Sequence, residues 1–444
     1  MSRPGSEDVW RHEAPHVLAA LLRRSRDFAA CEDAVQEALL AAAAQWPQEG
    51  TPDNPRAWLV RVASRKLIDE QRRRQSESAR EQRAAEQEPP GALVAPSAEE
   101  DSDRPRGDDT LQVLLLCAHP ALSDPSRVAL TLRAVAGLST AQVGAVFLVP
   151  ESTMAQRISR AKATIREAGA RLQPPTAEDL PARLHAVRHV LYLAFTAGHT
   201  SAVGPELLDL DLAEEAIRLA ERLHRALPRD VETAGLLALM LLTQARSRAR
   251  VDGHGDLVPL AEQDRTLWDR HLIARGTRMV EAALPEGPVG PFQLQAAIAA
   301  VHAEAATAAE TDWLQIVVLY RMLDRAAASP TVALNLAVAV GMAHGPGAGL
   351  AALAPLLDRD DGRGNHRVHA AHAHLLELAG DVAEASVAYA RAARLTQSMP
   401  EQRYLNRKAA ASRPCQTTGR RTANGKVPLT GWSDNGGSAV VRGS

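Results

Sequence analysis

The sequence is poor in cysteine: only Cys31, Cys117 and Cys415 occur among 444 residues. Their spacing fits neither a metal-ligand set nor a disulfide framework, which excludes a cysteine-stapled secreted domain. No stretch approaches the roughly 18 uninterrupted apolar residues of a membrane span. The first residues, Met1-Ser2-Arg3-Pro4-Gly5, also lack the apolar core of a signal peptide. We therefore expect a cytoplasmic protein that uses no metal and no cofactor.

Aromatic residues are equally rare, at 3% of the chain, and runs of β-branched residues are scarce. The remaining composition, 45% hydrophobic and 23% charged with abundant Ala, Leu and Arg, favours helices over sheets. A chain of this length is too long for one compact core. We expect an all-α protein with several domains.

Shifts in composition along the chain predict five segments. A helical unit is followed by a stretch rich in Glu, Gln, Ser and Pro, which buries too little apolar surface to fold and is typical of a flexible linker. A second small helical unit, a long helical extension and a tail rich in Gly, Ser, Thr and Arg come next. The predicted bounds are 8–75, 76–109, 110–173, 177–410 and 411–444, and we expect the last segment to be disordered.

Charge is distributed unevenly, although the net charge is only −2. Between Arg56 and Arg74 there are seven Lys or Arg against two acids, and between Ser152 and Arg171 there are five against one. Two basic helices in a nearly neutral protein indicate two contacts with a polyanion, although either helix alone is equally compatible with a solvated face.

The second basic helix has the pattern of a helix-turn-helix. A short helix over 138–147, capped by Ser139, is followed by a tight break at 148–151 and a second helix from Ser152. Apolar residues would close the small core between them: Val143, Val146, Met154 and Ile158. The second helix of such a unit enters the DNA major groove, with its early residues at the base edges. The predicted DNA-contacting residues are Ser152, Thr153, Gln156, Arg157, Arg160 and Lys162.

The stretch 123–166 resembles domain 4 of the extracytoplasmic-function sigma factors of bacterial RNA polymerase. The matching residues are Leu132, Arg133, Gly137, Leu138, Ser139, Val143, Thr153, Arg157, Arg160, Ala161 and Lys162. The resemblance implies binding to the −35 promoter element and to the flap of the polymerase β subunit. Gly144 stands where the family usually has Ala, and we expect it to loosen the first helix slightly.

The N-terminal unit resembles domain 2 of the same family. The segment Asp33-Ala34-Val35-Gln36-Glu37-Ala38-Leu39-Leu40 matches the helix with which the family docks on the clamp helices of polymerase β′. The resemblance implies that Asp33, Gln36 and Glu37 form this docking face. By residue type alone, a solvated face would be the preferred interpretation.

The helix after the Pro-rich stretch 46–55 resembles the element that binds the −10 promoter region. Its matching residues are Trp58, Leu59, Ala63, Ile68 and Asp69. Asn54 is placed to cap this helix, with Pro55 at its first position. The predicted −10 contacts are Asn54, Arg56, Arg61, Arg65, Lys66, Arg72 and Arg73. The 46–54 loop is predicted to form a pocket for an unstacked base, whereas Trp58 is expected to be a core residue.

The extension has the rhythm of helical repeats. Between His372 and Thr396, small residues, Gly380 and Tyr389 are spaced as in a tetratricopeptide repeat. The region 177–410 resembles the repeat-bearing extension of one sigma subgroup, and the resemblance implies that it regulates the sigma factor. We expect it to contact domains 2 and 4 or polymerase itself.

Two alternatives belong to other classes of protein. A stand-alone helix-turn-helix regulator with a ligand-sensing repeat domain would not need the segment 33–40. An enzyme within the extension would need convergent polar residues, for which the histidine-rich helix is the only candidate. Its histidines, at 366, 369, 372 and 374, are spread around the helix, so a ligand set is disfavoured. The Asp- and Gly-rich segment 250–256 lacks the closing Glu of a calcium loop and is predicted to be a turn or a docking loop for the sigma domains. We expect a sigma factor that is not an enzyme.

Overall fold

The computed structural model describes residues 6–83, 109–199 and 210–412, except residues 26, 148, 171, 173, 174 and 254. In these ranges the regular elements are helices, and β-pairing is limited to one isolated antiparallel bridge between Val251 and Leu257. The all-α prediction is confirmed. Most of the predicted linker and nearly all of the predicted tail lie outside the described residues.

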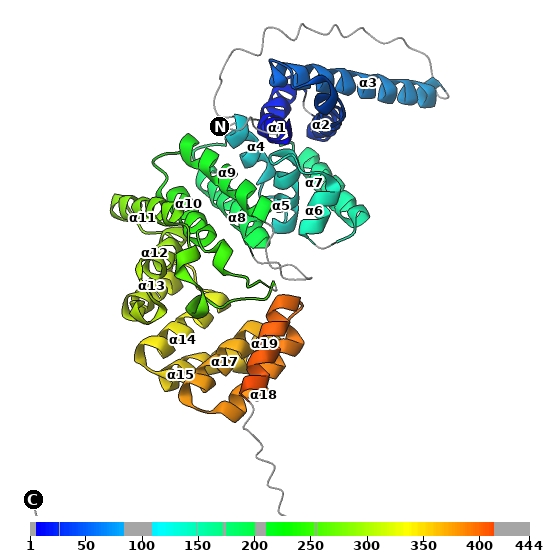
Figure 1. The fold of residues 1–444 in the computed structure, drawn as a ribbon. Coiled ribbons are helices and arrows are strands. Elements are labelled where there is room, and N and C mark those ends of the chain that lie inside the picture. The colour runs from blue at the N-terminus through cyan, green and yellow to red at the C-terminus, as the bar shows by residue number, and fades with distance from the viewer. Residues whose placement is uncertain are drawn as a thin grey trace, which may run out of the picture.

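The N-terminal unit packs three helices, α1 (Ser6–Leu22), α2 (Phe28–Glu49) and α3 (Pro55–Arg83) (Figure 1). Asp27 caps α2 by accepting a hydrogen bond from the amide of Ala30 at 3.0 Å. Asn54 caps α3 in the same way, through the amide of Ala57 at 3.0 Å, with Pro55 at the first helical position as predicted. α3 continues to Arg83, well into the segment predicted to be a flexible linker.

The prediction that residues 46–54 form a loop is wrong for residues 46–49. Helix α2 includes Trp46 and Pro47 and ends at Glu49, where the amide of Gly50 donates to the carbonyl of Trp46 at 3.0 Å. A proline this close to a helix end removes only one backbone hydrogen bond, so the last turn tolerates it. Trp46 is therefore buried, and its ring meets Trp58 edge-on at 5.5 Å between centroids. It forms part of the core and does not line a loop pocket.

The second unit consists of α4 (Asp109–Cys117), α5 (Asp124–Ala134), α6 (Thr140–Val146) and α7 (Glu151–Glu167). It lies against the N-terminal unit, with α2 beside α7 and α1 beside α4 (Figure 1).

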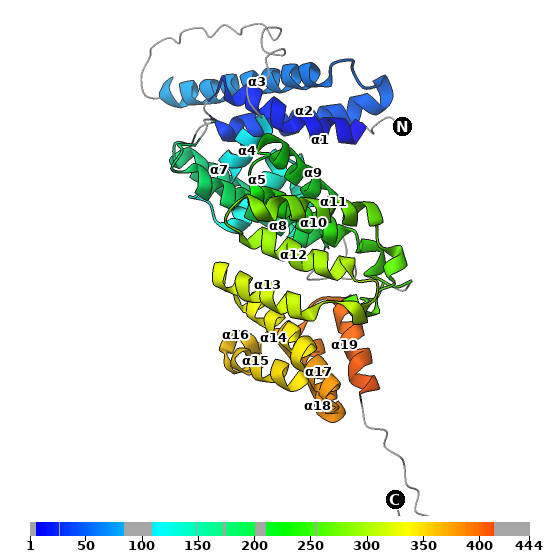
Figure 2. The same ribbon diagram turned by 90° about the vertical axis from the view of Figure 1, so that its left-hand side faces the viewer.

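The extension is a succession of helix pairs (Figures 1 and 2). Its first part contains α8 (Leu180–His199), α9 (Leu210–Ala226), α10 (Val231–Gln244), α11 (Arg270–Ala283) and α12 (Pro291–Glu304). Its second part contains α13 (Trp313–Ala326), α14 (Pro330–His344), α15 (Pro346–Asp358), α16 (Asp360–Arg363), α17 (His366–Ala379), α18 (Val382–Leu395) and α19 (Met399–Ala411). The predicted pair 372–396 is α17 and α18, joined by Gly380 at a φ of 89°. Short 3-10 turns lie between the helices, among them η3 (Arg265–Leu267).

The hydrophobic core does not follow the predicted domain bounds. One cluster of buried apolar side chains runs from Ala14 in α1 to Ala303 in α12, through both small units and the first part of the extension. Three smaller clusters lie farther along the chain, chiefly among the helices from α12 to α19. The first part of the extension therefore belongs to the same body as the two N-terminal units.

The pairing of α14 with α15 depends on close approach at Gly349. A Cβ built there would lie 2.7 Å from the Cα of Gly341 and 2.9 Å from Cδ2 of Leu375. We predict that Gly349→Ala lowers the free energy of unfolding by about 1–3 kcal/mol because the helices must separate. Gly347→Ala is the matched control, since a Cβ there meets nothing within 4 Å and alanine favours the helix by up to about 1 kcal/mol. Urea unfolding followed by circular dichroism would measure both, and equal effects would contradict the prediction.

Candidate functional site

Helices α6 and α7 form the predicted helix-turn-helix. Ser139 and Gln142 cap α6 reciprocally: the amide of Gln142 donates to Oγ of Ser139 at 3.2 Å, and the amide of Ser139 donates to Oε1 of Gln142 at 2.8 Å. Val143, Met154 and Ile158 are buried between the helices as predicted, whereas Val146 is only partly buried.

Gly144 lies where the turn folds back on α6. Its carbonyl accepts from the amide of Val149 at 3.0 Å, and a Cβ at this position would lie 3.1 Å from the carbonyl oxygen of Val149. The glycine therefore gives the turn room to approach the helix, a role that its low helix propensity alone does not indicate.

The start of α7 presents the predicted polar face to solvent. Ser152, Thr153, Gln156 and Arg160 are exposed. Arg157 is partly buried because its guanidinium lies over the ring of Phe147, 5.1 Å from the centroid. This stacking restricts the side chain, so less conformational freedom is lost when its donors bind a base or a phosphate.

Lys162, the last predicted DNA contact, lies elsewhere. Its side chain is buried against α2, where its ammonium forms ion pairs with Glu32 and with Asp33, the latter at 2.7 Å. In this conformation Lys162 cannot reach DNA. The prediction for this residue therefore requires the two units to separate.

Glu32 is the centre of this contact, and no sequence pattern singled it out. Its side chain is 1% exposed, and Oε1 lies 3.1 Å from Nε of Arg133 in α5, while Oε2 faces Lys162. A buried carboxylate is stable only when cations and hydrogen bonds compensate for lost hydration, and both cations come from the second unit. We call Glu32, Asp33, Arg133 and Lys162 the interdomain ion cluster.

The predicted docking face of α2 is partly covered by the same contact. Asp33 belongs to the interdomain ion cluster, and the side-chain amide of Gln36 is buried and donates to the carbonyl of Arg133 at 3.0 Å. Asp33 and Glu37 both remain open: the side chain of Asp33 is 59% exposed despite its pair with Lys162, and Glu37 forms an exposed ion pair with Lys66 at 3.0 Å. The three residues do share one side of α2, but two of them face α5 and α7.

The basic face of α3 remains available to solvent. Asn54, Arg61, Arg65, Lys66, Arg72 and Arg73 are exposed. Four of the predicted −10 contacts have structural roles as well: Asn54 caps the helix, Arg56 pairs with Glu13 at 2.5 Å, Lys66 pairs with Glu37, and Arg73 pairs with Glu70 at 2.8 Å. α3 thus keeps a positive surface that contacts neither the second unit nor the extension closely.

Further polar contacts hold the units together. Asp109 at the start of α4 accepts from Arg23 in α1 at 2.8 Å and lies 3.5 Å from His16. Burial alone would raise the pKa of Asp109, but these hydrogen bonds hold it below its usual value. From the extension, Arg183 in α8 donates to the carbonyl of Leu115 at 3.3 Å, and Arg222 in α9 contacts His12.

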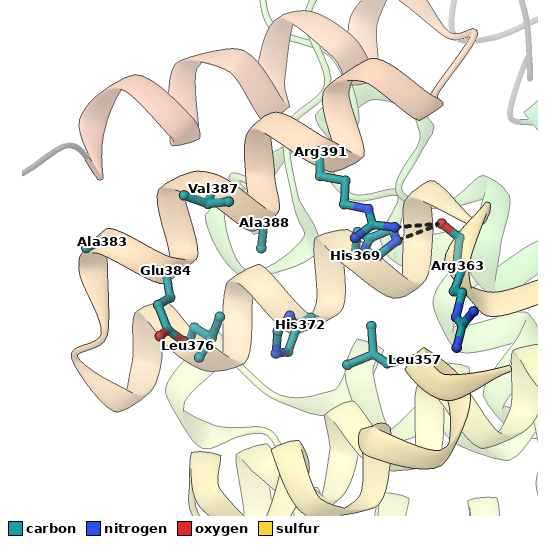
Figure 3. Close-up of a pocket in the computed structure, with 10 residues that line it drawn as sticks. All are labelled: Leu357, Arg363, His369, His372, Leu376, Ala383, Glu384, Val387, Ala388 and Arg391. Carbon is teal, nitrogen blue, oxygen red and sulfur yellow. Dashed lines mark hydrogen bonds between the residues drawn. The ribbon is translucent and has the colours of Figure 1, made fainter. Parts of the chain in front are cut away.

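The histidines of α17 face different partners. His366 pairs with Glu401 at 3.0 Å, and His369 Nε2 lies 3.0 Å from the carbonyl of Arg363. His372 lines an open cavity of about 630 Å³ between α17 and α18 that is mostly apolar (Figure 3). Within the described ranges, no three His, Cys, Asp or Glu side chains are arranged to hold a metal ion.

The Asp- and Gly-rich turn at 250–256 docks on α19. The carboxylate of Asp256 accepts from Arg403 and Arg407, and the amide of Asp256 donates to Asp252 at 2.9 Å. The turn therefore joins the two parts of the extension, and the alternative prediction that it docks on the sigma domains is wrong.

Comparison with known proteins agrees with the two small units. A family model described as "Sigma-70 region 2" matches residues 9–77, and one described as "Sigma-70, region 4" matches residues 112–165. Residues 183–284 match a "Family of unknown function". An "Uncharacterized protein" of Rhizobium meliloti (strain 1021) is 41% identical over 395 residues, which cover 88% of this chain and 92% of that protein. No solved structure matches. Among the described helices, none is long and apolar enough to cross a membrane.

The interdomain ion cluster predicts that two substitutions on α2 have unequal effects on the free energy of unfolding. Glu32→Gln leaves Arg133 without its counter-charge and Lys162 with Asp33 alone, and we expect it to lower the free energy of unfolding by about 3 kcal/mol. Glu37→Gln removes the same charge from an exposed pair with Lys66 and should change stability by less than about 1 kcal/mol. Urea unfolding of the full chain measures both. A change for Glu32→Gln no larger than that for Glu37→Gln would show that the buried pairs do not hold the units together.

Proposed function

The chain belongs to the sigma-70 family of RNA polymerase sigma factors, and from that premise we propose that it directs core polymerase to the promoters of a specific set of genes, under the control of its C-terminal extension. The observation that carries the proposal is the presence of both promoter-recognition regions, in the family's order, on one chain. A stand-alone helix-turn-helix regulator would have no use for the first of them. Catalysis would belong to core polymerase in the cytoplasm, and this chain would act without being an enzyme.

The two exposed basic helices would supply the DNA contacts. Arg157 and Arg160 on α7 would enter the major groove of the −35 element, where guanidinium groups bind guanine by paired hydrogen bonds. The exposed cations of α3, among them Arg61, Arg65 and Arg72, would bind the −10 region and its separated strand. The buried position of Trp46 and the partly buried position of Trp58 support a role for both in shaping α2 and α3, away from direct base stacking.

Polymerase would bind the side of α2 that carries Asp33, Gln36 and Glu37. The structure then represents a closed form, because α5 and α7 occupy part of that face. Opening would uncover Gln36 and free the already exposed Asp33 from its ion pair for the clamp helices of β′ and, at the same time, release Lys162 for DNA. One contact would thus restrain both activities.

The extension is placed to set the balance between the closed and open forms. Helices α8 and α9 contact α4, α8 also contacts α5, and the shared hydrophobic core continues into α12. A change in the packing of α8 would therefore shift the second unit. Through the interdomain ion cluster it would also shift α2. We propose that signals reach the sigma domains by this route.

Glu37 offers the cleanest test of the docking face, because it is exposed and takes no part in the interdomain contact. We expect Glu37→Lys to reduce both core-polymerase binding and promoter-specific transcription at least tenfold, since a lysine would repel a basic partner. Binding assays and in vitro transcription on the gene's own upstream region would measure this. Glu281→Lys, an exposed reversal on α11, is the control. Equal activity of the two variants would refute this docking face.

Glu32→Gln tests the closed form. Weakening the interdomain ion cluster should populate the open form, so the variant should bind core polymerase more tightly than the wild type. Glu37→Gln should not bind more tightly, because its ion pair with Lys66 lies within the N-terminal unit. Titration of labelled protein with core polymerase gives both affinities. Unchanged or weaker binding by Glu32→Gln would mean that the closed arrangement does not limit docking.

A further inference from the structure

A cluster of cationic and aromatic side chains lies inside the first part of the extension. His199 ends α8, Arg246 follows α10, Arg265 and Trp268 come from η3 and the residue after it, and His302 lies in the last turn of α12. The surrounding loops lie close to α19, through the pairing of Asp256 with Arg403 (Figure 1). These residues come from four separate elements, so the fold alone brings them together.

Two arginines of the cluster share one indole ring. The guanidinium carbon of Arg265 lies 4.5 Å from the ring centroid of Trp268, and that of Arg246 lies 6.0 Å from the Trp268 ring centroid. Arg265 also donates to the carbonyls of His302 at 2.7 Å and Ala305 at 2.6 Å, which fixes it to the end of α12. Arg246 forms no ion pair with a described residue.

The surroundings of Arg246 disfavour the charged form of its guanidinium group. Burial, followed by the charges of Arg250 and Arg265, lowers the pKa of Arg246 to about 10. Burial and the same arginine-rich field lower the pKa of His199 to about 3 and that of His302 to about 4. Both histidines are therefore neutral near pH 7, and the positive potential comes from the arginines.

The acids near the cluster are engaged elsewhere. Glu401 faces Arg250, but it binds His366 at 3.0 Å and Thr396 at 2.9 Å. Glu310 faces Arg265 from an exposed position and accepts from Thr307 at 2.8 Å. Neither acid is among the groups that shift the pKa of Arg246.

Buried hydrogen-bonding groups without partners lie in the same cluster. His199 is 3% exposed and stacks on Phe195; the side chain of Gln244 is its neighbour for hydrogen bonding, which leaves a second ring nitrogen without a partner. The indole nitrogen of Trp268 is also buried without an acceptor. Buried polar groups are normally satisfied, so unsatisfied donors beside a concentration of positive charge indicate a place for an acceptor that carries negative charge.

We propose that this cluster binds a small multivalent oxyanion, a phosphate group or a polycarboxylate, with Arg246 as its principal ligand. Guanidinium groups match the planar or tetrahedral oxygens of such anions by paired hydrogen bonds. His199 and Trp268 would supply neutral donors. Four of the five residues lie within the segment that matches a family of unknown function, 183–284, so the proposal assigns that segment a ligand class.

Binding to the purified full-length chain tests the proposal without polymerase or DNA, so its failure would be distinct from failure of the sigma-factor role. The probes are inorganic phosphate, pyrophosphate and citrate, each added at constant ionic strength set with sodium chloride. We expect at least one probe to raise the melting temperature saturably and to give a binding isotherm by calorimetry. Binding of the phosphates alone or of citrate alone would support the proposal and identify the class. Saturable binding of none of the three would overturn it.

A matched pair of variants locates the site. Arg246→Gln should weaken binding at least tenfold, whereas Arg248→Gln, which removes an exposed charge two residues away, should retain it. Equal loss in both variants would overturn the assignment of Arg246. Without anion, Arg246→Gln should melt at the same temperature as the wild type or higher, because the variant lacks a buried cation that neighbouring arginines repel. A lower melting temperature would show that Arg246 serves only to pack on Trp268, and would also overturn the proposal.

Discussion

The buried carboxylate of Glu32 constrains the arrangement of the whole N-terminal half. A charge at 1% exposure must be compensated locally, and the compensating cations, Arg133 and Lys162, lie on two helices of the other unit. α2 cannot move away from α5 and α7 without either hydrating Glu32 or leaving it unpaired. The neighbouring contacts, from Asp33 to Lys162 and from Gln36 to the Arg133 carbonyl, then follow from helical spacing along α2.

The extension shares a hydrophobic core with helices that are far from it in the sequence. The hydrophobic core that begins in α1 continues through α8 and α10 to α12. α13 to α19 pack largely through smaller clusters of their own and contact the body through α12 and the turn that holds Asp256. The cationic cluster around Arg246 lies next to this junction. A ligand there would act where the two parts of the extension meet.

Local features were predictable from the sequence. Ser139 and Asn54 cap helices because their side chains reach amides three residues ahead, and Val143, Met154 and Ile158 meet because helical periodicity places them on one face. Pro47 was misplaced because proline was treated as a helix breaker without regard to its position, and the last turn of α2 can accommodate it. The register of the two units was not predictable. Glu32, one residue before the recognised motif, and Lys162, at the end of another, acquire their roles only through the packing of helices more than 100 residues apart. Arg246 likewise has no local pattern, since its partners come from three other elements.

The chemistry of the contact suits a reversible closure better than an apolar contact would. A buried ion pair contributes little net stability relative to well-packed apolar residues, because desolvation offsets the attraction between the charges. When the units separate, each of these charged side chains regains its hydration, and only the apolar side chains of the shared core add hydrophobic surface. Lys162 becomes a cation next to the recognition residues of α7, and Gln36 joins the already exposed Asp33 as a polar group on an accessible helix face. An apolar contact of equal strength would leave exposed hydrophobic patches on both units after opening. Charge complementarity therefore holds the units together through residues that become hydrated polar groups once the units part.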